Sequence, residues 1–234
     1  MNKQSNIYTT IYIIVLVLIV GTALAATSLA LRDKQQANAN ADKMRQILAS
    51  VNITAPAGDV VATFDRCITD RFVINSAGDK IEGNAFDINV AEQVKLPDSE
   101  RKLPVFVCTT ETDGTKYILP AYGAGLWGPI WGYISIDSDG STVYGAYFAH
   151  QGETPGLGAE IEKPAFSDQF IGKRLLIDGE FHSIAVVKNG QAPANGEDYV
   201  NGISGGTITS KGVNDMLANC LTPYKSFLES LSTK

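Results

Sequence analysis

The sequence predicts an α+β protein in which one membrane-spanning helix precedes a domain with a mostly antiparallel sheet and flanking helices. Three observations support this fold class. Residues 11–31 carry no charged side chain. Two pairs of β-rich segments are joined around Asp-Gly dipeptides, which are typical of hairpin turns. From Ser210 onward apolar residues recur at helical spacing. Strands followed by helices, without strict alternation, favour an α+β domain.

The N-terminal segment is the strongest single signal. As a helix, residues 11–31 would be about 30 Å long, enough to cross the hydrocarbon core of a bilayer. A cleaved signal peptide is the competing interpretation, because Ala23-Leu24-Ala25 resembles a cleavage site. We favour an uncleaved anchor, since the apolar run continues through Leu29 and Leu31. The predicted organisation is a short cytoplasmic N-terminus at 1–10, a transmembrane helix at 11–31 and an exported domain at 32–234. Lys3 before the run and Arg32 after it leave the orientation open on charge alone.

Local patterns predict the elements that follow. Met44, Ile47, Leu48 and Val51 form a helical stripe that ends before Pro56. Short strands are predicted at 60–64 and 71–75, and residues 86–96 are assigned to no element. Longer strands are predicted at 105–109 and 116–119 around Asp113-Gly114, and at 130–137 and 141–149 around Asp139-Gly140. A short helix at 166–172, a strand at 181–187 and a C-terminal helix follow, with Thr209 or Ser210 as N-cap and a break at Pro223.

Composition excludes several classes of function. The 234-residue chain has a net charge of −6 and no long Lys/Arg run, so it offers little to offset a nucleic-acid backbone. Its three cysteines form no CxxC pair and its two histidines are far apart, so the ligand spacing of a tetrahedral zinc site is missing. We therefore expect neither a nucleic-acid partner nor a metal site.

Residues 123–128, GAGLWG, match the GxGxxG pattern of dinucleotide-binding folds. Such a site requires a helix to open at the glycines, but Pro129 follows them and the next segment is predicted to be a strand. A glycine-rich turn that presents Leu126 and Trp127 is the favoured interpretation. The Trp127 ring either packs within the protein or offers a flat apolar face to a planar ligand.

Residues 150–158, HQGETPGLG, predict a tight turn in which Gly156 and Gly158 allow a positive φ or close approach of the backbone. Glu153 is a candidate acid but has no carboxylate partner nearby in sequence, and no GxSxG motif points to a hydrolase. An exported hydrolase that uses Glu153 is an alternative without an identified partner residue, and His150 with Glu153 is interpreted as a polar surface pair.

Residues 204–210, SGGTITS, predict either a surface turn with a helix cap or a phosphate site. Gly205 and Gly206 let backbone N–H groups approach an anion, and the hydroxyl groups of Ser204 and Thr207 can donate to phosphate oxygens. The helix that follows favours negative charge at its N-terminus.

Taken together and in this order, the segments GLW at 125–127, HQGETPGLG at 150–158 and SGGTITS at 204–210 resemble the FMN-binding domain of ion-pumping respiratory complexes. The resemblance is greatest to the C subunits of sodium-translocating NADH:quinone oxidoreductases and extends to the G subunits of Rnf complexes. It covers most of the chain, with the FMN-binding core at about 103–234. It implies an FMN that a flavin transferase joins, by a phosphoester bond from FAD, to the second threonine of the pattern, here Thr209, which makes the chain a phosphoprotein.

The resemblance implies further expectations. Ser204, Gly205, Gly206 and Thr207 would lie on the phosphate side, Trp127, Leu126 and Leu157 would cover the flavin ring, and Glu153, Thr154 and Gly156 would reach its polar edge or ribityl chain. The chain would be a single-pass, largely periplasmic member of a complex of six subunits in the bacterial inner membrane, in contact with lipid. It would relay electrons between partner subunits during ubiquinone reduction and sodium transport, without being catalytic alone. The alternatives are a G subunit of an Rnf complex and an exported binding module without redox function.

Overall fold

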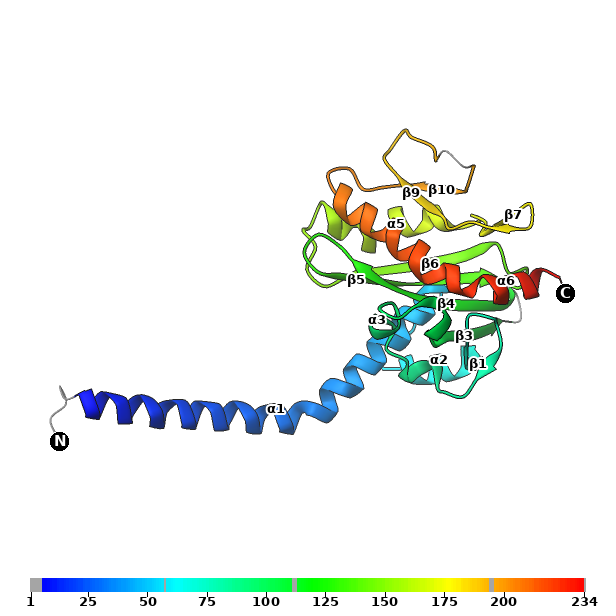
Figure 1. Cartoon of the computed structure of the whole chain (residues 1–234). Coiled ribbons are helices and arrows are strands. Elements are labelled where there is room, and N and C mark those ends of the chain that lie inside the picture. Colours follow the sequence, from blue (N-terminus) through cyan, green and yellow to red (C-terminus); the bar gives the residue numbers. More distant parts are fainter. Residues whose placement is uncertain (1–5, 57, 111–112, 194–195, 234) are drawn as a thin grey trace. The chain divides into compact units, whose positions relative to one another are not determined.

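A computed structural model describes residues 6–56, 58–110, 113–193 and 196–233. The chain divides into two compact units, Met1–Lys43 and Met44–Lys234. The predicted fold class is confirmed, because a long apolar N-terminal helix precedes a mostly antiparallel sheet with flanking helices (Figure 1).

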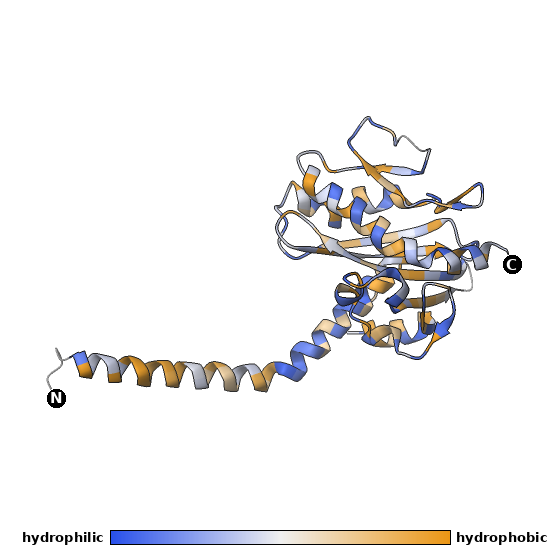
Figure 2. Ribbon diagram, viewed as in Figure 1, coloured by the Kyte–Doolittle hydropathy of each residue, from blue (hydrophilic) through white to orange (hydrophobic). Residues whose placement is uncertain are grey.

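Helix α1, Asn6–Ser50, runs without a break through the predicted anchor and through the amphipathic segment after it. Within the described residues it is the one helix long and apolar enough to cross a membrane. Figure 2 shows that apolar residues dominate its N-terminal part and polar residues the part that follows. Its last turns belong to the second unit, where Ile47 and Leu48 are fully buried. Whether residues 11–31 remain attached in the mature protein stays a prediction.

The second unit is built on a six-stranded sheet in the order β2-β1-β3-β4-β5-β6, with every neighbouring pair antiparallel. Both predicted hairpins are confirmed: β3 returns as β4 at Gly114, and β5 returns as β6 through a turn in which Gly140 has a φ of +70°. Residues 111–112 of the first turn lie outside the described residues. The strands are β1 Ile68–Ile74, β2 Lys80–Ile81, β3 Leu103–Thr110, β4 Gly114–Ala124, β5 Pro129–Asp137 and β6 Val143–His150.

The sheet separates two hydrophobic clusters, because alternate side chains of a strand point to opposite faces. On β3, Val105 joins the cluster under the C-terminal helices, whereas Phe106 joins the cluster against the end of α1 and helix α2. On β4, Leu119 and Ile118 divide in the same way. The second unit therefore has three layers, with helices on both faces of the sheet (Figure 1).

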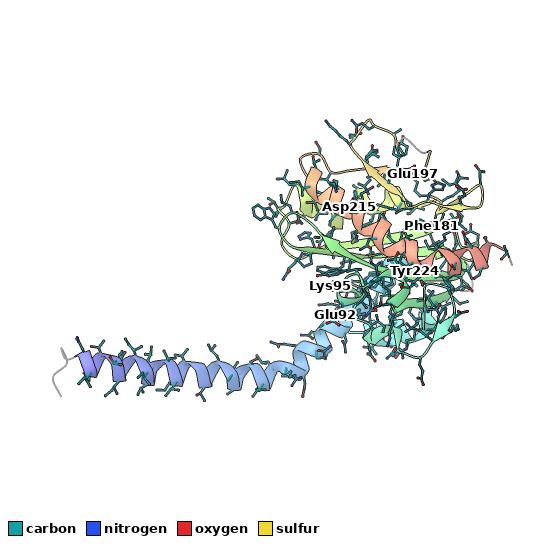
Figure 3. All side chains as sticks on the ribbon, in the orientation of Figure 1. Glu92, Lys95, Phe181, Glu197, Asp215 and Tyr224 are labelled. Atoms are coloured by element: carbon teal, nitrogen blue, oxygen red, sulfur yellow. The ribbon has the colours of Figure 1, made fainter. Side chains whose placement is uncertain are left out.

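The C-terminal layer contains α5, Thr207–Leu221, the 3₁₀ turn Thr222–Tyr224 and α6, Lys225–Ser232. The break predicted at Pro223 is confirmed, because proline cannot donate a helical hydrogen bond. Tyr224 lies at the junction of the two helices over the sheet (Figure 3), and its hydroxyl group donates to the Pro104 carbonyl at 2.8 Å. Burial raises the pKa of this phenol well above its ordinary value.

Two predicted elements are wrong. Residues 60–64 form no strand but belong to helix α2, Val60–Cys67, in which Val60, Thr63 and Phe64 are buried at i, i+3 and i+4. Four β-favouring residues in a run of five suit either a strand or one face of a helix, and tertiary packing of the helical face decided the outcome. Neither Thr209 nor Ser210 is an N-cap, because α5 begins two residues earlier, after Gly206.

Short elements connect these layers. The strand predicted at 181–187 is divided into β8 and β9, and the helix predicted at 166–172 is α4 with the 3₁₀ turn after it. β9 pairs with β10 in parallel, beside α5. The remaining elements are the 3₁₀ turns Ala85–Asp87, Asp98–Glu100, Gly158–Glu162 and Asp168–Phe170, the helices α3 Val90–Gln93 and α4 Pro164–Ser167, and the strands β7 Leu176–Ile177, β8 Glu180–Phe181, β9 Ala185–Val187 and β10 Tyr199–Asn201.

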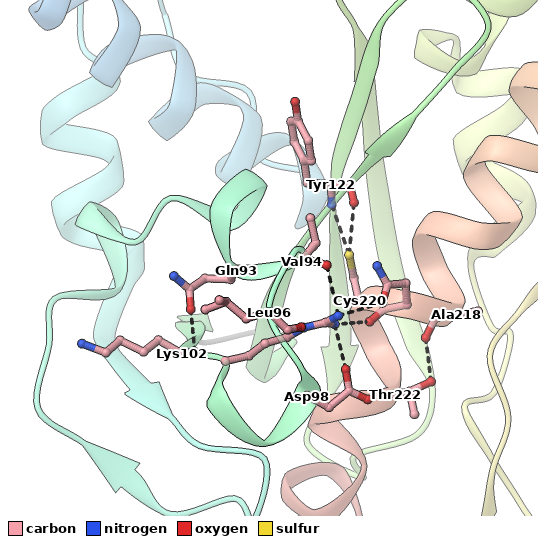
Figure 4. A network of polar contacts seen from close by, with 11 residues as sticks. Gln93, Val94, Leu96, Asp98, Lys102, Tyr122, Ala218, Cys220 and Thr222 are labelled. Atoms are coloured by element: carbon pink, nitrogen blue, oxygen red, sulfur yellow. Dashed lines mark hydrogen bonds and ion pairs between the residues drawn. The ribbon is translucent and has the colours of Figure 1, made fainter.

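A buried arginine joins the segment before β3 to the end of α5 (Figure 4). The guanidinium group of Arg101 donates to the carbonyls of Leu96, Val94 and Asn219, at 2.9, 3.2 and 2.8 Å, and pairs with Asp98 at 3.1 Å. Only 7% of the residue is exposed. One side chain thus satisfies carbonyl groups from two distant parts of the chain.

Candidate functional site

Three turns that are distant in sequence meet at one buried pair of side chains. Thr209, the third residue of α5, donates its hydroxyl hydrogen to Oε2 of Glu153 at 2.6 Å. The two residues are only 1% and 5% exposed. Thr209 is therefore held on the sheet side of α5, close to the helix N-terminus, where the first backbone N–H groups have no acceptor within the helix.

Glu153 is held through both its carboxylate and its backbone. Its Oε1 accepts a hydrogen bond from the backbone N–H of Trp127 at 2.8 Å, and its own N–H donates to Nδ1 of His150 at 3.1 Å. Nε2 of His150 lies 3.7 Å from Oε1 of Glu162. The interpretation of His150 and Glu153 as a polar surface pair is wrong, because the end of β6 turns both side chains inward, where backbone groups satisfy them.

Glycines make room for this pair. A Cβ atom on Gly158 would lie 2.4 Å from Oγ1 of Thr209 and 2.3 Å from Oε2 of Glu153. A Cβ atom on Gly125 would lie 2.5 Å from Oε1 of Glu153. Gly205 has a φ of +77°, and a Cβ there would lie 2.8 Å from Cδ2 of Leu157. The backbone at each of these three glycines therefore packs directly against a side chain of another turn: Gly125 and Gly158 against the buried pair, and Gly205 against Leu157.

Large apolar side chains of the same turns remain exposed. Trp127 is 68% exposed and Ile208 is 57% exposed. Leu126 and Leu157 are exposed at 48% and 43%. These four side chains, which we call the apolar rim, lie on the turns that carry the buried pair. Folding alone leaves them in water, which is typical of a surface that binds something apolar.

Three of the four predicted phosphate-side residues line a cavity that Thr209 does not line. Ser204, Gly205 and Thr207 line a cavity of about 320 Å³, together with Ser210 and Lys211. Thr209 does not line this cavity, and Gly206 is buried at the N-cap. The other lining residues are Val186, Val187, Lys188, Asn189, Gly202, Ile203, Asn214 and Asp215.

The remaining predicted residues lie at the edge of the site. Thr154 is exposed, and its carbonyl accepts from the N–H groups of Leu157 and Ala159 and so closes the turn. Gly156 has a φ of +75° with open space around it, so it serves the turn and not close packing. Both stay candidates for cofactor contact.

Sequence reasoning missed Gly125, His150, Glu162 and Ile208 as parts of the site. It singled out Gly158 for close backbone approach but did not assign it to the site. The glycines were visible in GLW and GLG, but their role depends on the contact between distant turns. The position of His150, three residues before Glu153, could have indicated that it belongs to the same site. Ile208 carried a clearer signal, because an apolar residue between two threonines at a helix start has no buried face to join.

Other chemistry has less support. The GAGLWG segment is the turn between β4 and β5, closed by the Gly125 N–H to the Gly128 carbonyl at 2.8 Å, and no helix opens there. In the part of the chain that the structure describes, no three His, Cys, Asp or Glu side chains group as metal ligands. Burial raises the pKa of the Cys108 and Cys220 thiols to about 11, which keeps both protonated at neutral pH.

Comparison with known proteins places these turns in a family. An FMN-binding domain model matches residues 125–222, which include all three turns. The C subunit of the Na(+)-translocating NADH-quinone reductase of Vibrio vulnificus is 34% identical over 230 residues, covering 91% of this chain and 90% of the relative. The C subunit of the same reductase of Vibrio alginolyticus is 36% identical over 219 residues, covering 86% and 84%.

A solved structure agrees with the sequence relatives. The crystal structure of the C subunit of the Na(+)-translocating NADH-quinone reductase from Parabacteroides distasonis superposes with a TM-score of 0.79 at 51% identity, covering 85% of this chain and 96% of that chain. Both the fold and most of the length are therefore shared. The chain belongs to the family of C subunits of the Na(+)-translocating NADH-quinone reductase, with an FMN-binding domain.

Proposed function

We propose that the chain is the electron-transfer subunit of a sodium-pumping NADH:quinone oxidoreductase and carries one FMN joined covalently to Thr209. One observation carries the proposal: the three segments that resemble an FMN-binding domain converge on the buried pair formed by Thr209 and Glu153. The covalent bond would replace the hydroxyl hydrogen, so the hydrogen bond from Thr209 to Glu153 would be lost on modification.

The residues around Thr209 fit a flavin and its phosphate. The N-terminus of α5 favours an anion, and the Ser204–Thr207 turn offers hydroxyl and backbone N–H donors two to five residues before Thr209, at a cavity that Thr209 does not line in this structure. The apolar rim offers faces for the isoalloxazine ring, chiefly Trp127, Leu126 and Leu157. Glu153, Thr154 and Gly156 would lie at the polar edge of the ring or the ribityl chain.

Bound FMN supplies the redox chemistry, and the protein supplies binding, orientation and electrostatics. A covalent tether prevents loss of the cofactor and makes docking of the ring on the apolar rim intramolecular. A site of this kind needs no acid, base or nucleophile of its own for electron transfer. The buried thiols of Cys108 and Cys220 agree with this, because protonated thiols do not act as nucleophiles.

The chain would work as one of six subunits. Its α1 segment 11–31 would anchor it in the inner membrane in contact with lipid, with the second unit in the periplasm, where a flavin transferase would supply FMN from FAD. Sodium would cross through partner subunits, because one span without internal charge forms no ion pathway by itself. The family named above favours this complex over the Rnf alternative.

The test is the intact mass of the full chain after co-expression with a periplasmic flavin transferase. The wild type should gain one FMN-phosphoryl mass that survives denaturation, and Thr209→Ala should gain none. Thr222→Ala is a matched control at the other end of α5, where the hydroxyl donates only to the Ala218 carbonyl at 2.6 Å. If the wild type gains no mass while a control protein is modified, an exported binding module becomes the better interpretation.

A further inference from the structure

In the buried contact between Thr209 and Glu153, the hydroxyl group is the hydrogen-bond donor and the carboxylate is the acceptor. Oε2 of Glu153 accepts the hydroxyl hydrogen at 2.6 Å, which is short for an O–H···O bond and typical of a carboxylate acceptor. Among the described residues Glu153 has no ion pair with Lys or Arg, and the second donor to its side chain is the neutral N–H of Trp127. This carboxylate is thus aimed at one hydroxyl group and is neutralised by no cation.

The geometry of the pair is supported from behind. The N–H of Glu153 is held by His150, and Oε1 is held by Trp127, so the second carboxylate oxygen has a fixed direction. Gly125 and Gly158 make room for the carboxylate in this position, because a Cβ atom on either glycine would lie within 2.5 Å of one of its oxygens. A group held this way is preorganised for a single acceptor role.

We propose that Glu153 is the general base for attachment of FMN to Thr209, a step that rests on the function proposed above. Oγ1 of Thr209 forms a bond to the FMN-side phosphorus of FAD. The bond from that phosphorus to the bridging oxygen of the pyrophosphate breaks, and AMP leaves with the electron pair. The hydroxyl proton passes to Oε2 of Glu153. No electrons are gained or lost, so no oxidant or reductant is required.

The position of Thr209 explains why the chain supplies its own base. Only 1% of the residue is exposed, so a transferase must first move one of the turns that cover it. A base on the transferase would have to enter together with the phosphoryl donor. Glu153 is already in contact with the reacting oxygen, which is the first requirement for a general base.

The experiment measures the rate of FMN attachment to the full chain in detergent, with purified flavin transferase and saturating FAD, by intact mass over time. Glu153→Gln keeps the size and one oxygen acceptor but cannot take up the proton. A general base contributes about 10²–10⁴-fold, so kcat should fall at least about 100-fold. KM for the protein substrate should change less than about threefold, because the contacting surface is unchanged.

Three further variants keep the test decisive. Glu153→Asp retains a carboxylate and should recover at least about tenfold of the loss, which a purely structural role would not predict. Glu160→Gln is the matched control, because Glu160 lies in the same segment and accepts only the Gly156 N–H at 3.1 Å among the described contacts. It should modify at the wild-type rate. Thermal unfolding of each variant shows whether the fold is kept. If Glu153→Gln unfolds, kcat for FMN attachment is compared between Glu153→Asp and Glu153→Ala, and a higher kcat for Glu153→Asp supports the general base.

The outcomes separate this inference from the proposed function. If wild type and Glu153→Gln both gain FMN at Thr209 with the same kcat, the base is elsewhere and the inference is wrong, while the proposed function stands. A rise in KM alone would also overturn it, because Glu153 would then act in recognition. If the wild type gains no FMN while a control protein does, the proposed function and this inference fail together.

Discussion

At the scale of the residue, Gly158 shows how a missing side chain shapes the site. We expect Gly158→Ala to destabilise the fold by about 1–3 kcal/mol, because its Cβ would overlap Thr209 and Glu153. The same overlap should prevent FMN attachment by separating the two side chains. Gly152→Ala is the control, since a Cβ there meets nothing within 4 Å. Thermal unfolding and intact mass measure both effects, and equal behaviour of the two variants would contradict this account of the site.

Asp139 makes the stability of the β5–β6 turn depend on pH. Burial opposes ionisation of its carboxyl, but hydrogen bonds from the Thr142 hydroxyl and from the N–H groups of Ser141 and Thr142 outweigh it, so the pKa lies below its ordinary value of 3.8. A lowered folded-state pKa stabilises the fold above the unfolded value, and the stabilisation is lost as pH falls through the folded value.

We therefore expect Asp139→Asn to be less stable than the wild type near pH 6, and the difference to shrink as the pH falls below 3.8. Urea unfolding at a series of pH values measures this, with Ser138→Ala as an uncharged control in the same turn. A difference that stays constant from pH 6 to pH 3 would mean that the Asp139 carboxylate is not the titrating group responsible.

At the scale of the element, sequence reasoning succeeded where the signal was local. Hairpin turns require a backbone conformation that Asp-Gly adopts readily, which is a local property of the sequence. Both long hairpins could therefore be predicted without knowing how the rest of the chain packs on them. The break at Pro223 is likewise a property of one residue. Residues 60–64 are different, because Val60, Thr63 and Phe64 suit either a strand or a helical face, and the choice depends on the cluster they join.

Arg101 fixes one element against another, and its loss should be costly. We expect Arg101→Met to destabilise the fold by about 1–3 kcal/mol, because the carbonyls of Leu96, Val94 and Asn219 would lose the charged donor that they share. Arg101→Lys should recover little, since one ammonium cannot reach all the acceptors that the planar guanidinium reaches. Lys102→Ala, at an exposed neighbour, is the control for urea unfolding. A loss below about 0.5 kcal/mol in Arg101→Met would contradict this role.

At the scale of the whole molecule, the limit of sequence reasoning is the contact between Glu153 and Thr209. The two residues are 56 positions apart, and each lies in a segment that has a local explanation as a turn. The resemblance to a family pointed to Thr209 and to both segments, but it implied no bond between them. That bond depends on the sheet, which carries the end of β6 to the N-terminus of α5.

The division into two units predicts where the chain can be shortened. A chain that begins at Met44 should fold and accept FMN at Thr209, because residues up to Lys43 form a separate unit. A chain that begins at Ala55 should be markedly less stable. It loses the fully buried Ile47 and Leu48, each worth about 1.5–3 kcal/mol, and the Ser50 carbonyl that accepts from Ser135 Oγ at 2.5 Å. Urea unfolding of both chains, with intact mass after exposure to the transferase, compares them directly.

Equal unfolding midpoints would show that the last turns of α1 add nothing to the stability of the sheet they cover. Failure of the longer chain to take up FMN would show that the anchor itself is needed for modification.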